Sequence, residues 1–422
     1  MLLSAFVVPY DLFGMSSGHR AVGSDASAKK YLLGTHRIVE PDVTVARMRP
    51  FMPLMGITRI ADVTGLDRLG IPVTIVCRPN SRSVAVSQGK GTTLAAAEAS
   101  GLMESIESYH AERITLPLKY AGYEELRYSH PMVDLDALPR MKGSRFHPCL
   151  PILWIEGENL LSGERSWLPF ELAHTNFSKP MPTGSGCFPA SSNGLASGNH
   201  ELEALCHGIS EVIERDSTAL WYARRDHESV ERRVRLETIT DPACRALLET
   251  FEAKGVDVAI WETTTDIGVP SFYCWIMERE DRPRLLDRPT VGAGCHPAPP
   301  IALSRALTEA AQDRLTLITG ARDDLKRGKY QGIAAQNVFD LRPERSFPID
   351  AQEQGLTIQE DLDLLLGCLR KAGLSEVLAI RLMKPEFGDI PVVRIVIPGL
   401  EGLPDQPSYL PGRRAQKLLS NR

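Results

Sequence analysis

Polar side chains that could bind a ligand or take part in a reaction line one face of the helix predicted at about 199–221. At ~100° per residue, Asn199, His207, Glu211 and Glu214 fall on one side of this helix. The opposite side is apolar, as a core helix requires, and carries Leu205, Ile209, Val212 and Ile213. Like charges three or four residues apart destabilise a helix by a few tenths of a kcal/mol per pair, and Arg215 is almost the sole compensating cation. The pattern therefore indicates that a cation not encoded in the sequence balances this face.

A second acidic stripe follows Gly91 on a helix predicted at about 92–113. Ser100, Glu104 and Glu107 stand at i, i+4 and i+7 and share one narrow face. An offset of 107 residues superimposes Glu104 on Glu211 and Glu107 on Glu214, which is a weak internal repeat. If the two helices face each other, four carboxylates converge, an arrangement that is stable only around hard divalent cations such as Mg²⁺. Two ordinary amphipathic helices with solvated acidic faces are the alternative, and the spacing alone leaves both open.

Two further patterns could contact an anion. Gly89-Lys90-Gly91 suits phosphate oxygens if it forms a turn at a helix start, but it lacks the GxxxxGK[ST] spacing of a Walker A loop. On a third helix, predicted after the prolines at 297–300, a polar row holds Arg305, Glu309 and Gln312, with Arg314 nearby. An exposed ladder of salt bridges is the alternative for this row.

Composition narrows the classes of function. The 422 residues are 43% hydrophobic and 24% charged with a formal net charge of −5, which gives no indication of nucleic-acid binding. Eight scattered cysteines without a CxxC pair indicate reduced thiols in the cytoplasm. The apolar N-terminus lacks a basic segment and is interrupted by Pro9 and Asp11, so no cleaved signal is expected. No run approaches the ~20 apolar residues of a membrane span.

The element order predicts a mixed α/β (α+β) fold. Strands are predicted at 57–65, 71–80, 81–87, 152–161, 165–173, 256–264, 271–280, 377–383 and 392–399, and helices at 41–56, 92–113, 199–221, 243–255, 301–324 and 358–373. Residues 88–91 are predicted as the turn into the first acidic helix. Residues 1–29 are expected to form a flexible leader, and the end of the chain is rich in proline.

Five segments together closely resemble the YcaO family of ATP-dependent peptide-modifying enzymes. They are THRIVEP, GITRIADVTGLDRLGIP, QGKGTTLAAAEASGLMESIES, SNGLASGNHELEALCHGISEVIERD and ALSRALTEAAQDR, in family order. The resemblance implies a catalytic domain at 30–400, a C-terminal tail at 401–422, and packed subdomains with an ATP cleft between long acidic helices and mixed sheets.

The resemblance also implies site residues and two cofactors, ATP and Mg²⁺. The metal ligands would be Glu104, Glu107, Glu211 and Glu214. The ATP contacts would be Arg37, Thr44, Ser100, Asn199, Glu203, Arg215, Gln312 and Arg314, to which the phosphate-loop interpretation adds Lys90. One departure is Ser108, which stands where the family often has arginine and puts a phosphate contact there in doubt. No catalytic side chain is assigned.

The activity implied by the resemblance is O-phosphorylation of a backbone amide in a peptide or protein substrate. The PGLEG ending resembles stand-alone members associated with TfuA-type partners, which favours thioamidation with a TfuA-like partner and a sulfur donor. The alternatives are a cyclodehydratase that forms azolines from Cys, Ser or Thr, a small-molecule ligase or kinase, and a non-catalytic accessory protein. We expect a cytoplasmic homodimer that binds neither nucleic acid nor membrane.

Overall fold

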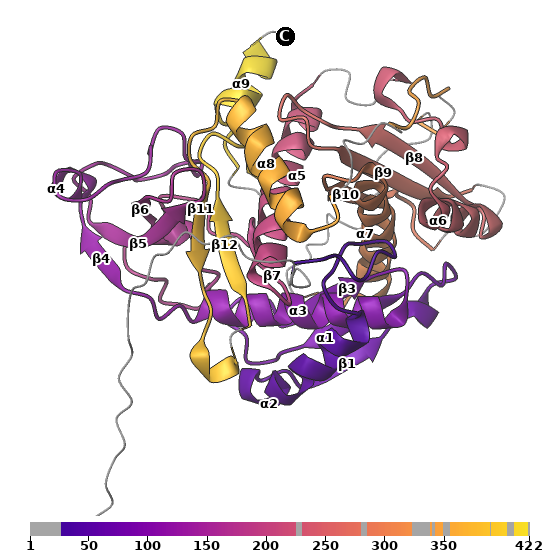
Figure 1. The fold of residues 1–422 in the computed structure, drawn as a ribbon, viewed down its shortest axis with the longest axis horizontal. Helices are drawn as coiled ribbons and strands as arrows, with labels where there is room; N and C mark the ends of the chain where they lie inside the picture. Colours follow the sequence, from indigo (N-terminus) through magenta and orange to yellow (C-terminus); the bar gives the residue numbers. More distant parts are fainter. Residues whose placement is uncertain are drawn as a thin grey trace, which may run out of the picture.

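The computed structural model describes residues 27–224, 230–279, 285–322, 338–339, 342–348, 355–388, 390–402 and 409–420. Within these ranges the chain forms three antiparallel sheets with long helices packed against them (Figure 1). Residues 1–26 of the predicted leader lie outside the described residues, whereas Ala28 at its end forms a β-bridge with Thr357. None of the described helices is both long enough and apolar enough to cross a membrane.

The first sheet has the order β1-β2-β3, with β1 at Arg59–Asp62, β2 at Val73–Cys77 and β3 at Val86–Lys90. It follows α1 (Pro41–Met48), η1 (Arg49–Phe51) and α2 (Met52–Met55), which ends at a left-handed Gly56, as the sequence predicted. The strands predicted at 57–65 and 71–80 are confirmed as β1 and β2, which pair with each other in antiparallel orientation. The turn predicted at 88–91 is wrong for 88–90, because these residues complete β3 and pair with Val73–Ile75 of β2.

The second sheet is the largest and has the order β4-β5-β11-β12-β7, with β6 paired to β5. Its strands are β4 (Leu118–Ala121), β5 (Ile152–Asn159), β6 (Arg165–Pro169), β7 (Leu195–Ser197), β11 (Leu378–Arg381) and β12 (Val392–Val396). Helices α5 (Glu201–Ala223) and α8 (Ile358–Lys371) pack together beside it, and α4 (Tyr123–Leu126) follows β4. The tail contains α9 (Arg413–Ser420), a helix that the proline count did not predict.

The third sheet has the order β10-β9-β8, with β8 at Val256–Glu262, β9 at Ser271–Glu278 and β10 at Thr290–Cys295. The strands predicted at 256–264 and 271–280 are therefore confirmed as β8 and β9, and they pair as a hairpin. Helices α6 (Pro242–Ala253) and α7 (Pro299–Thr319) cover this sheet. Short 3₁₀ turns complete the described elements: η2 (Thr64–Leu66), η3 (Phe170–Leu172), η4 (Val230–Arg232), η5 (Leu236–Thr238) and η7 (Pro385–Phe387).

Three long helices follow the same pattern, in which a strand leads directly into a helix that packs back against it. The pairs are β3 with α3 (Leu94–Glu112), β7 with α5, and β10 with α7. Glycines permit the close contact: a Cβ on Gly89 of β3 would lie 1.9 Å from the carbonyl oxygen of Ala97, and one on Gly292 of β10 would lie 2.1 Å from that of Ala306. The backbone contact fixes the height and rotation of each helix on its strand, and therefore the direction of its polar face.

The apolar faces of the acidic helices form the core, as the sequence predicted. On α5, Ile209 is 0% and Ile213 is 1% exposed, and on α3 both Leu102 and Ile106 are 0% exposed. Burial of such side chains contributes about 1.5–3 kcal/mol each. Burial of the apolar face fixes the rotation of each helix about its axis. It therefore also fixes the direction in which the acidic stripe points.

We predict that Gly89→Ala destabilises the fold. A methyl group at this position would overlap the backbone of α3, so the helix must move, at a cost of about 1–3 kcal/mol in the free energy of unfolding. Denaturant unfolding measures the change. The matched control is Gly65→Ala, because no atom lies within 4 Å of a Cβ built on exposed Gly65. Equal unfolding free energies for both variants would contradict the close β3–α3 contact.

Candidate functional site

The acidic stripes of α3 and α5 face a common space. The carboxylates of Glu104 and Glu107 lie near enough to Glu211 for its negative charge to raise the pKa of both. Glu107 and Glu214 are 9% and 4% exposed, and Glu104 and Glu211 are half-buried. The converging arrangement, rather than two separate solvated faces, is therefore the one that the fold adopts.

Burial makes the ionised forms of these carboxylates costly. It raises the pKa of Glu104 to about 7, although the charges of Arg322 and Lys90 oppose the change. Burial also raises the pKa of Glu107 well above its ordinary value and raises that of Glu214. A group of buried carboxylate oxygens with raised pKa values is a donor set suited to a hard cation such as Mg²⁺, whose charge would stabilise the ionised forms.

The short strand β7 anchors one carboxylate from each helix. The hydroxyl of Ser197 donates to Oε1 of Glu107 over 2.7 Å, and the backbone N–H of Gly194, just before β7, donates to Oε1 of Glu211 over 3.3 Å. Strand β7 packs against both α3 and α5. The two helices are thus oriented relative to each other through one strand.

Helix α7 adds a fifth carboxylate to the site. Lys90, at the end of β3, forms an ion pair with Glu309, whose other oxygen accepts a 3.4 Å hydrogen bond from the N–H of Ala293. Burial alone would raise the pKa of Glu309, but the charges of Lys90 and Arg215 lower it. The charge of Glu309 in turn raises the pKa of Glu214. Glu309 therefore belongs to the same electrostatic group as the predicted metal ligands.

Arg305 of α7 contacts α5 and is not part of an exposed row of salt bridges. Its Nη2 donates to Nε2 of His207 over 2.8 Å. Burial, reinforced by the charge of Arg305, lowers the pKa of His207 well below its ordinary value, so the imidazole is neutral and its Nε2 accepts. Arg305 was not predicted as a site residue, because its only signal in the sequence is its place on the polar row of the third helix.

The segment before α1 is tied to the start of α5 through Glu203. Its carboxylate accepts from the backbone N–H groups of Ile38, over 2.6 Å, and Asn199, over 2.8 Å. The hydroxyl of Thr44 donates to Oδ1 of Asn199 over 3.1 Å. Burial lowers the pKa of the neighbouring Arg37 guanidinium, an effect that the charge of Glu203 opposes. Four of the predicted nucleotide contacts therefore lie close together: Arg37, Thr44, Asn199 and Glu203. The hydrogen bonds of Glu203 show that it also orients the backbone at Ile38 and Asn199.

The remaining predicted contacts differ in their surroundings. Gln312 donates through Nε2 to the carbonyl oxygen of Gln88 in β3 over 2.8 Å, so it links α7 to the first sheet. Ser100 lies one turn before Glu104 on the acidic stripe of α3, and Arg215 lies 3.7 Å from Glu214. Arg314 is 2% exposed. Its guanidinium binds Asp67 at 2.7 Å and Glu278 at 2.9 Å, which indicates a role in joining α7 to the first and third sheets.

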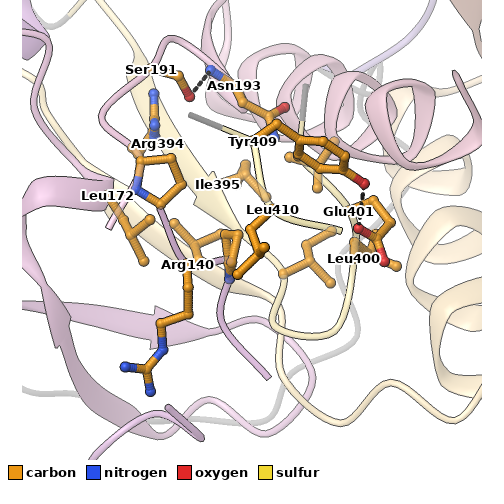
Figure 2. Close-up of a pocket in the computed structure, with 16 residues that line it drawn as sticks. Arg140, Leu172, Ser191, Asn193, Arg394, Ile395, Leu400, Glu401, Tyr409 and Leu410 are labelled. Atoms are coloured by element: carbon orange, nitrogen blue, oxygen red, sulfur yellow. Dashed lines mark hydrogen bonds between the residues drawn. The ribbon is translucent and has the colours of Figure 1, made fainter. Parts of the chain in front are cut away.

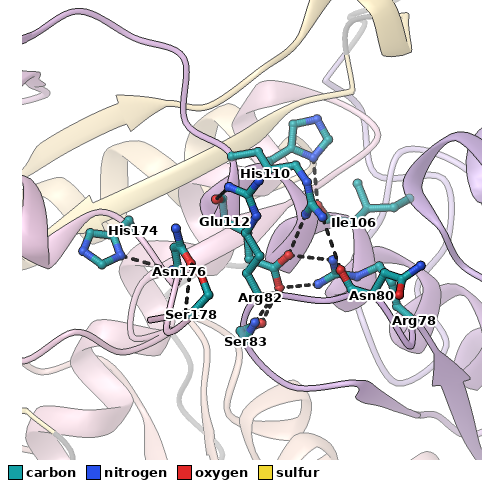
Figure 3. Close-up of polar contacts among 11 residues, drawn as sticks. Arg78, Asn80, Arg82, Ser83, Ile106, His110, Glu112, His174, Asn176 and Ser178 are labelled. Carbon is teal, nitrogen blue, oxygen red and sulfur yellow. Dashed lines mark hydrogen bonds and ion pairs between the residues drawn. The ribbon is translucent and has the colours of Figure 1, made fainter. Parts of the chain in front are cut away.

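The C-terminal end of α3 is fixed by a buried ion pair (Figure 3). Arg78, after β2, donates twice to Glu112 over 2.6 and 2.5 Å, and Ser83 donates from its backbone N–H over 3.0 Å. Burial alone would raise the pKa of Glu112, but these hydrogen bonds lower it. Such bidentate pairs are geometrically specific. The ion pair therefore fixes the C-terminal end of α3, the helix that carries Ser100, Glu104 and Glu107.

One other cluster of possible metal ligands lies within the described ranges, at His36, His296 and Asp361. Nδ1 of His296 accepts a 3.0 Å hydrogen bond from the N–H of Ala298, so its proton lies on Nε2. Lys29 forms a 2.8 Å ion pair with Asp361. The Lys29–Asp361 pair joins the N-terminal segment to α8, and Lys29 already neutralises the one carboxylate of the cluster.

Comparison with known proteins identifies the family. The model of the family described as YcaO cyclodehydratase, ATP- and Mg²⁺-binding, matches residues 88–401. An uncharacterized protein in the tfuA 3′ region of Rhizobium leguminosarum bv. trifolii is 36% identical over 380 residues, which span 86% of this chain and 88% of that protein. An uncharacterized protein of Methanothermobacter thermautotrophicus is 36% identical over 400 residues, or 90% and 99% of the two chains.

Solved structures share the fold. A heterocyclase in complex with substrate and cofactor aligns with a TM-score of 0.73 at 24% identity; the match covers 89% of this chain and 54% of the heterocyclase. The YcaO protein of Methanopyrus kandleri, bound with AMPPCP and Mg²⁺, aligns with a TM-score of 0.68 at 21% identity over 92% and 99% of the chains. The chain belongs to the YcaO family, whose domain binds ATP and Mg²⁺.

We predict that Glu104→Gln or Glu211→Gln removes Mg²⁺-dependent ATP hydrolysis. Loss of a ligand should weaken metal binding by more than the ~10–100-fold that follows loss of an outer-shell partner. Without nucleotide, thermal unfolding should be unchanged or slightly raised, because each substitution relieves repulsion among buried carboxylates. Mg·ATP at 100 times its Kd should stabilise the wild type by about 2.7 kcal/mol and the variants by much less.

The control for this experiment is Glu98→Gln, which changes a carboxylate on α3 outside the acidic stripe. It should retain both hydrolysis and the stabilising shift. Normal turnover in both Glu104→Gln and Glu211→Gln would disprove a shared metal site.

We also predict that the metal-free protein becomes less stable as pH rises from about 4.5 to about 7. The folded protein holds a proton on Glu104 up to a pKa of about 7, whereas the unfolded chain releases it near the ordinary value of 4.5. Glu104 alone should account for a loss of up to roughly 3 kcal/mol across this window. Melting temperatures of wild type and Glu104→Gln between pH 5 and pH 8 measure it. A difference between the two proteins that does not change with pH would contradict the raised pKa.

Proposed function

We propose that this protein activates a backbone amide of a peptide or protein substrate by ATP-dependent O-phosphorylation, and that the product is a thioamide. The observation that carries the proposal is the convergence of Glu104, Glu107, Glu211 and Glu214 from two helices, with Lys90 and Glu309 beside them. A site of this charge fits a triphosphate only together with a divalent cation. Membership of an ATP- and Mg²⁺-binding family supports it.

The chemistry requires activation because an amide is a poor electrophile with a poor leaving group. A nucleophile adds to the amide carbon, the carbonyl oxygen gains the electron pair, and its phosphorylation turns that oxygen into a leaving group. When bound, Mg²⁺ neutralises negative charge on the triphosphate. The protein's own contribution is positional: Arg37, Lys90 and Arg215 supply positive charge around the nucleotide, and the ties from Glu203 and Ser197 hold the surrounding helices in place.

Sulfur as the incoming nucleophile is supported by one relative and by the PGLEG segment. A protein 36% identical to this one is encoded in a tfuA 3′ region, which supports a TfuA-like partner. The PGLEG segment at 398–402 resembles that of stand-alone, TfuA-associated members. The second candidate is cyclodehydration, which the family description and the heterocyclase fold match favour; there the nucleophile would be a Cys, Ser or Thr side chain of the substrate.

We predict that ATP consumption depends on the acceptor peptide. The purified protein alone should hydrolyse ATP slowly, because the amide must be positioned before phosphoryl transfer is productive. Addition of the cognate peptide, a TfuA-like protein and a sulfide source should yield ADP, phosphate and a peptide in which one oxygen is replaced by sulfur. Mass spectrometry of the peptide, together with phosphate release, is the measurement.

The outcomes separate the candidates. Loss of water from the peptide without added sulfide would show cyclodehydration and disprove thioamidation. Phosphorylation or ligation of a small metabolite with no change in any peptide would disprove amide activation, while the nucleotide site could still stand.

A further inference from the structure

A small cavity lies between β12, the turn before β7 and the C-terminal tail (Figure 2). Its volume is about 50 Å³, and its walls are largely apolar, with Val212, Ile395 and Leu400 among them. A water needs roughly 10–15 Å³ on this measure, so the space admits a group of a few heavy atoms and not a nucleotide. The size of the cavity is therefore compatible with a single small group such as one peptide unit.

The main charge at the cavity is Arg394, which is 2% exposed on β12, a strand between β11 and β7. Its Nε and Nη1 have no hydrogen-bond partner within the described ranges. Burying unpaired donors of a charged group is costly, so these two groups are available to an acceptor that enters the cavity. The neighbouring imidazole of His174 does not supply that acceptor. Burial and the charge of Arg394 lower its pKa to about 4, and its Nδ1 already accepts a 3.1 Å hydrogen bond from the N–H of Asn176, so its Nε2 carries the proton.

The other charged side chains at the cavity are already engaged. Arg140 donates to the carbonyl oxygen of Leu135 over 3.3 Å and stacks on Phe146 with 4.6 Å between guanidinium carbon and ring centre. The carboxylate of Glu401 accepts from the hydroxyl of Tyr409 and from two backbone N–H groups of the tail, each over 2.8 Å. Arg394 is thus the charged group at the cavity whose donors remain available.

A complementary acceptor, Asn193, also lines the cavity. Its Oδ1 is buried and has no hydrogen-bond donor among the described residues. The next residue, Gly194, donates its N–H to Glu211 and accepts from the N–H of Ile395 over 2.7 Å. One short turn therefore connects the acceptor in the cavity, the strand that carries Arg394 and a predicted metal ligand.

We propose that this cavity binds the peptide unit that is to be modified, with its carbonyl oxygen on the Nε and Nη1 groups of Arg394 and its N–H on Oδ1 of Asn193. An amide offers one acceptor and one donor in a plane of a few atoms, which matches the unpaired groups and the volume. This proposal rests on the proposed function, and it makes Arg394 a catalytic residue and Asn193 a determinant of specificity for amides.

The role of Arg394 follows the electrons of the reaction. Hydrosulfide adds to the amide carbon, the π pair of the carbonyl moves to oxygen, and the guanidinium stabilises the resulting oxyanion. That oxygen attacks the γ-phosphorus, whose bond to the β,γ-bridging oxygen breaks as ADP leaves. The phosphorylated oxygen then departs as phosphate with its electron pair, the C=S bond forms, and the proton of the sulfur passes to the phosphate.

The test is a titration of the full chain, with ¹⁵N-labelled arginine Nε groups followed by NMR, using N-methylacetamide as the probe. The resonance of Arg394, assigned by its absence in Arg394→Lys, should shift saturably. Methyl acetate, which has the carbonyl but no N–H, should bind about threefold to tenfold more weakly, as loss of one hydrogen bond implies. Asn193→Ala should abolish that preference, and Arg140→Gln should preserve it.

Two results would overturn the proposal: no saturable shift with N-methylacetamide, or a shift produced by sodium bromide and not by the amide, which would show a simple anion pocket. If Arg394→Lys does not fold, the amide–ester preference of the wild type and its loss in Asn193→Ala still decide. Binding of Mg·AMPPCP is measured in the same samples. If Mg·AMPPCP does not bind while the amide titration is normal, the result would count against the proposed function and leave the amide site in place.

Discussion

Buried carboxylates cannot share a small space in ionised form unless a cation or several hydrogen bonds compensate them. Helices α3 and α5 place Glu104, Glu107, Glu211 and Glu214 in such a space, and the described protein contacts compensate them only in part. The apo protein meets this constraint by raising carboxyl pKa values, so that protons stand where metal charge would act. A metal bound by these carboxylates would therefore release protons from them.

The fold satisfies this constraint through repeated strand–helix units rather than through a rigid loop. Gly89 and Gly101 bring β3 and α3 into backbone contact, and Gly194 and Gly208 do the same where α5 meets the second sheet. Distant ties then fix the helix ends, as the Arg78–Glu112 pair does for α3. The polar groups of the candidate site therefore lie on helix faces and not on a glycine-rich turn.

The sequence predicted the acidic stripes, the apolar faces and the order of the long helices, because each of these depends on periodicity within one segment. It was wrong about residues 88–90, where a glycine and a lysine suggested a turn; Gly89 serves a close strand–helix contact instead. Glu309, Arg305 and Arg394 were not assigned to the site, because their roles depend on contacts between segments far apart in the chain. The helix α9 was missed since flanking prolines dominated the local pattern.

The central claim is that carboxylates from α3 and α5 hold one shared metal site. The most direct measurement is a crystal structure of the protein with AMPPCP and Mn²⁺, in which anomalous scattering locates the metal. The account predicts Mn²⁺ density bridging the triphosphate, with ligands from both the Glu104–Glu107 pair and the Glu211–Glu214 pair. Metal bound by only one helix, or at a position away from both, would contradict it.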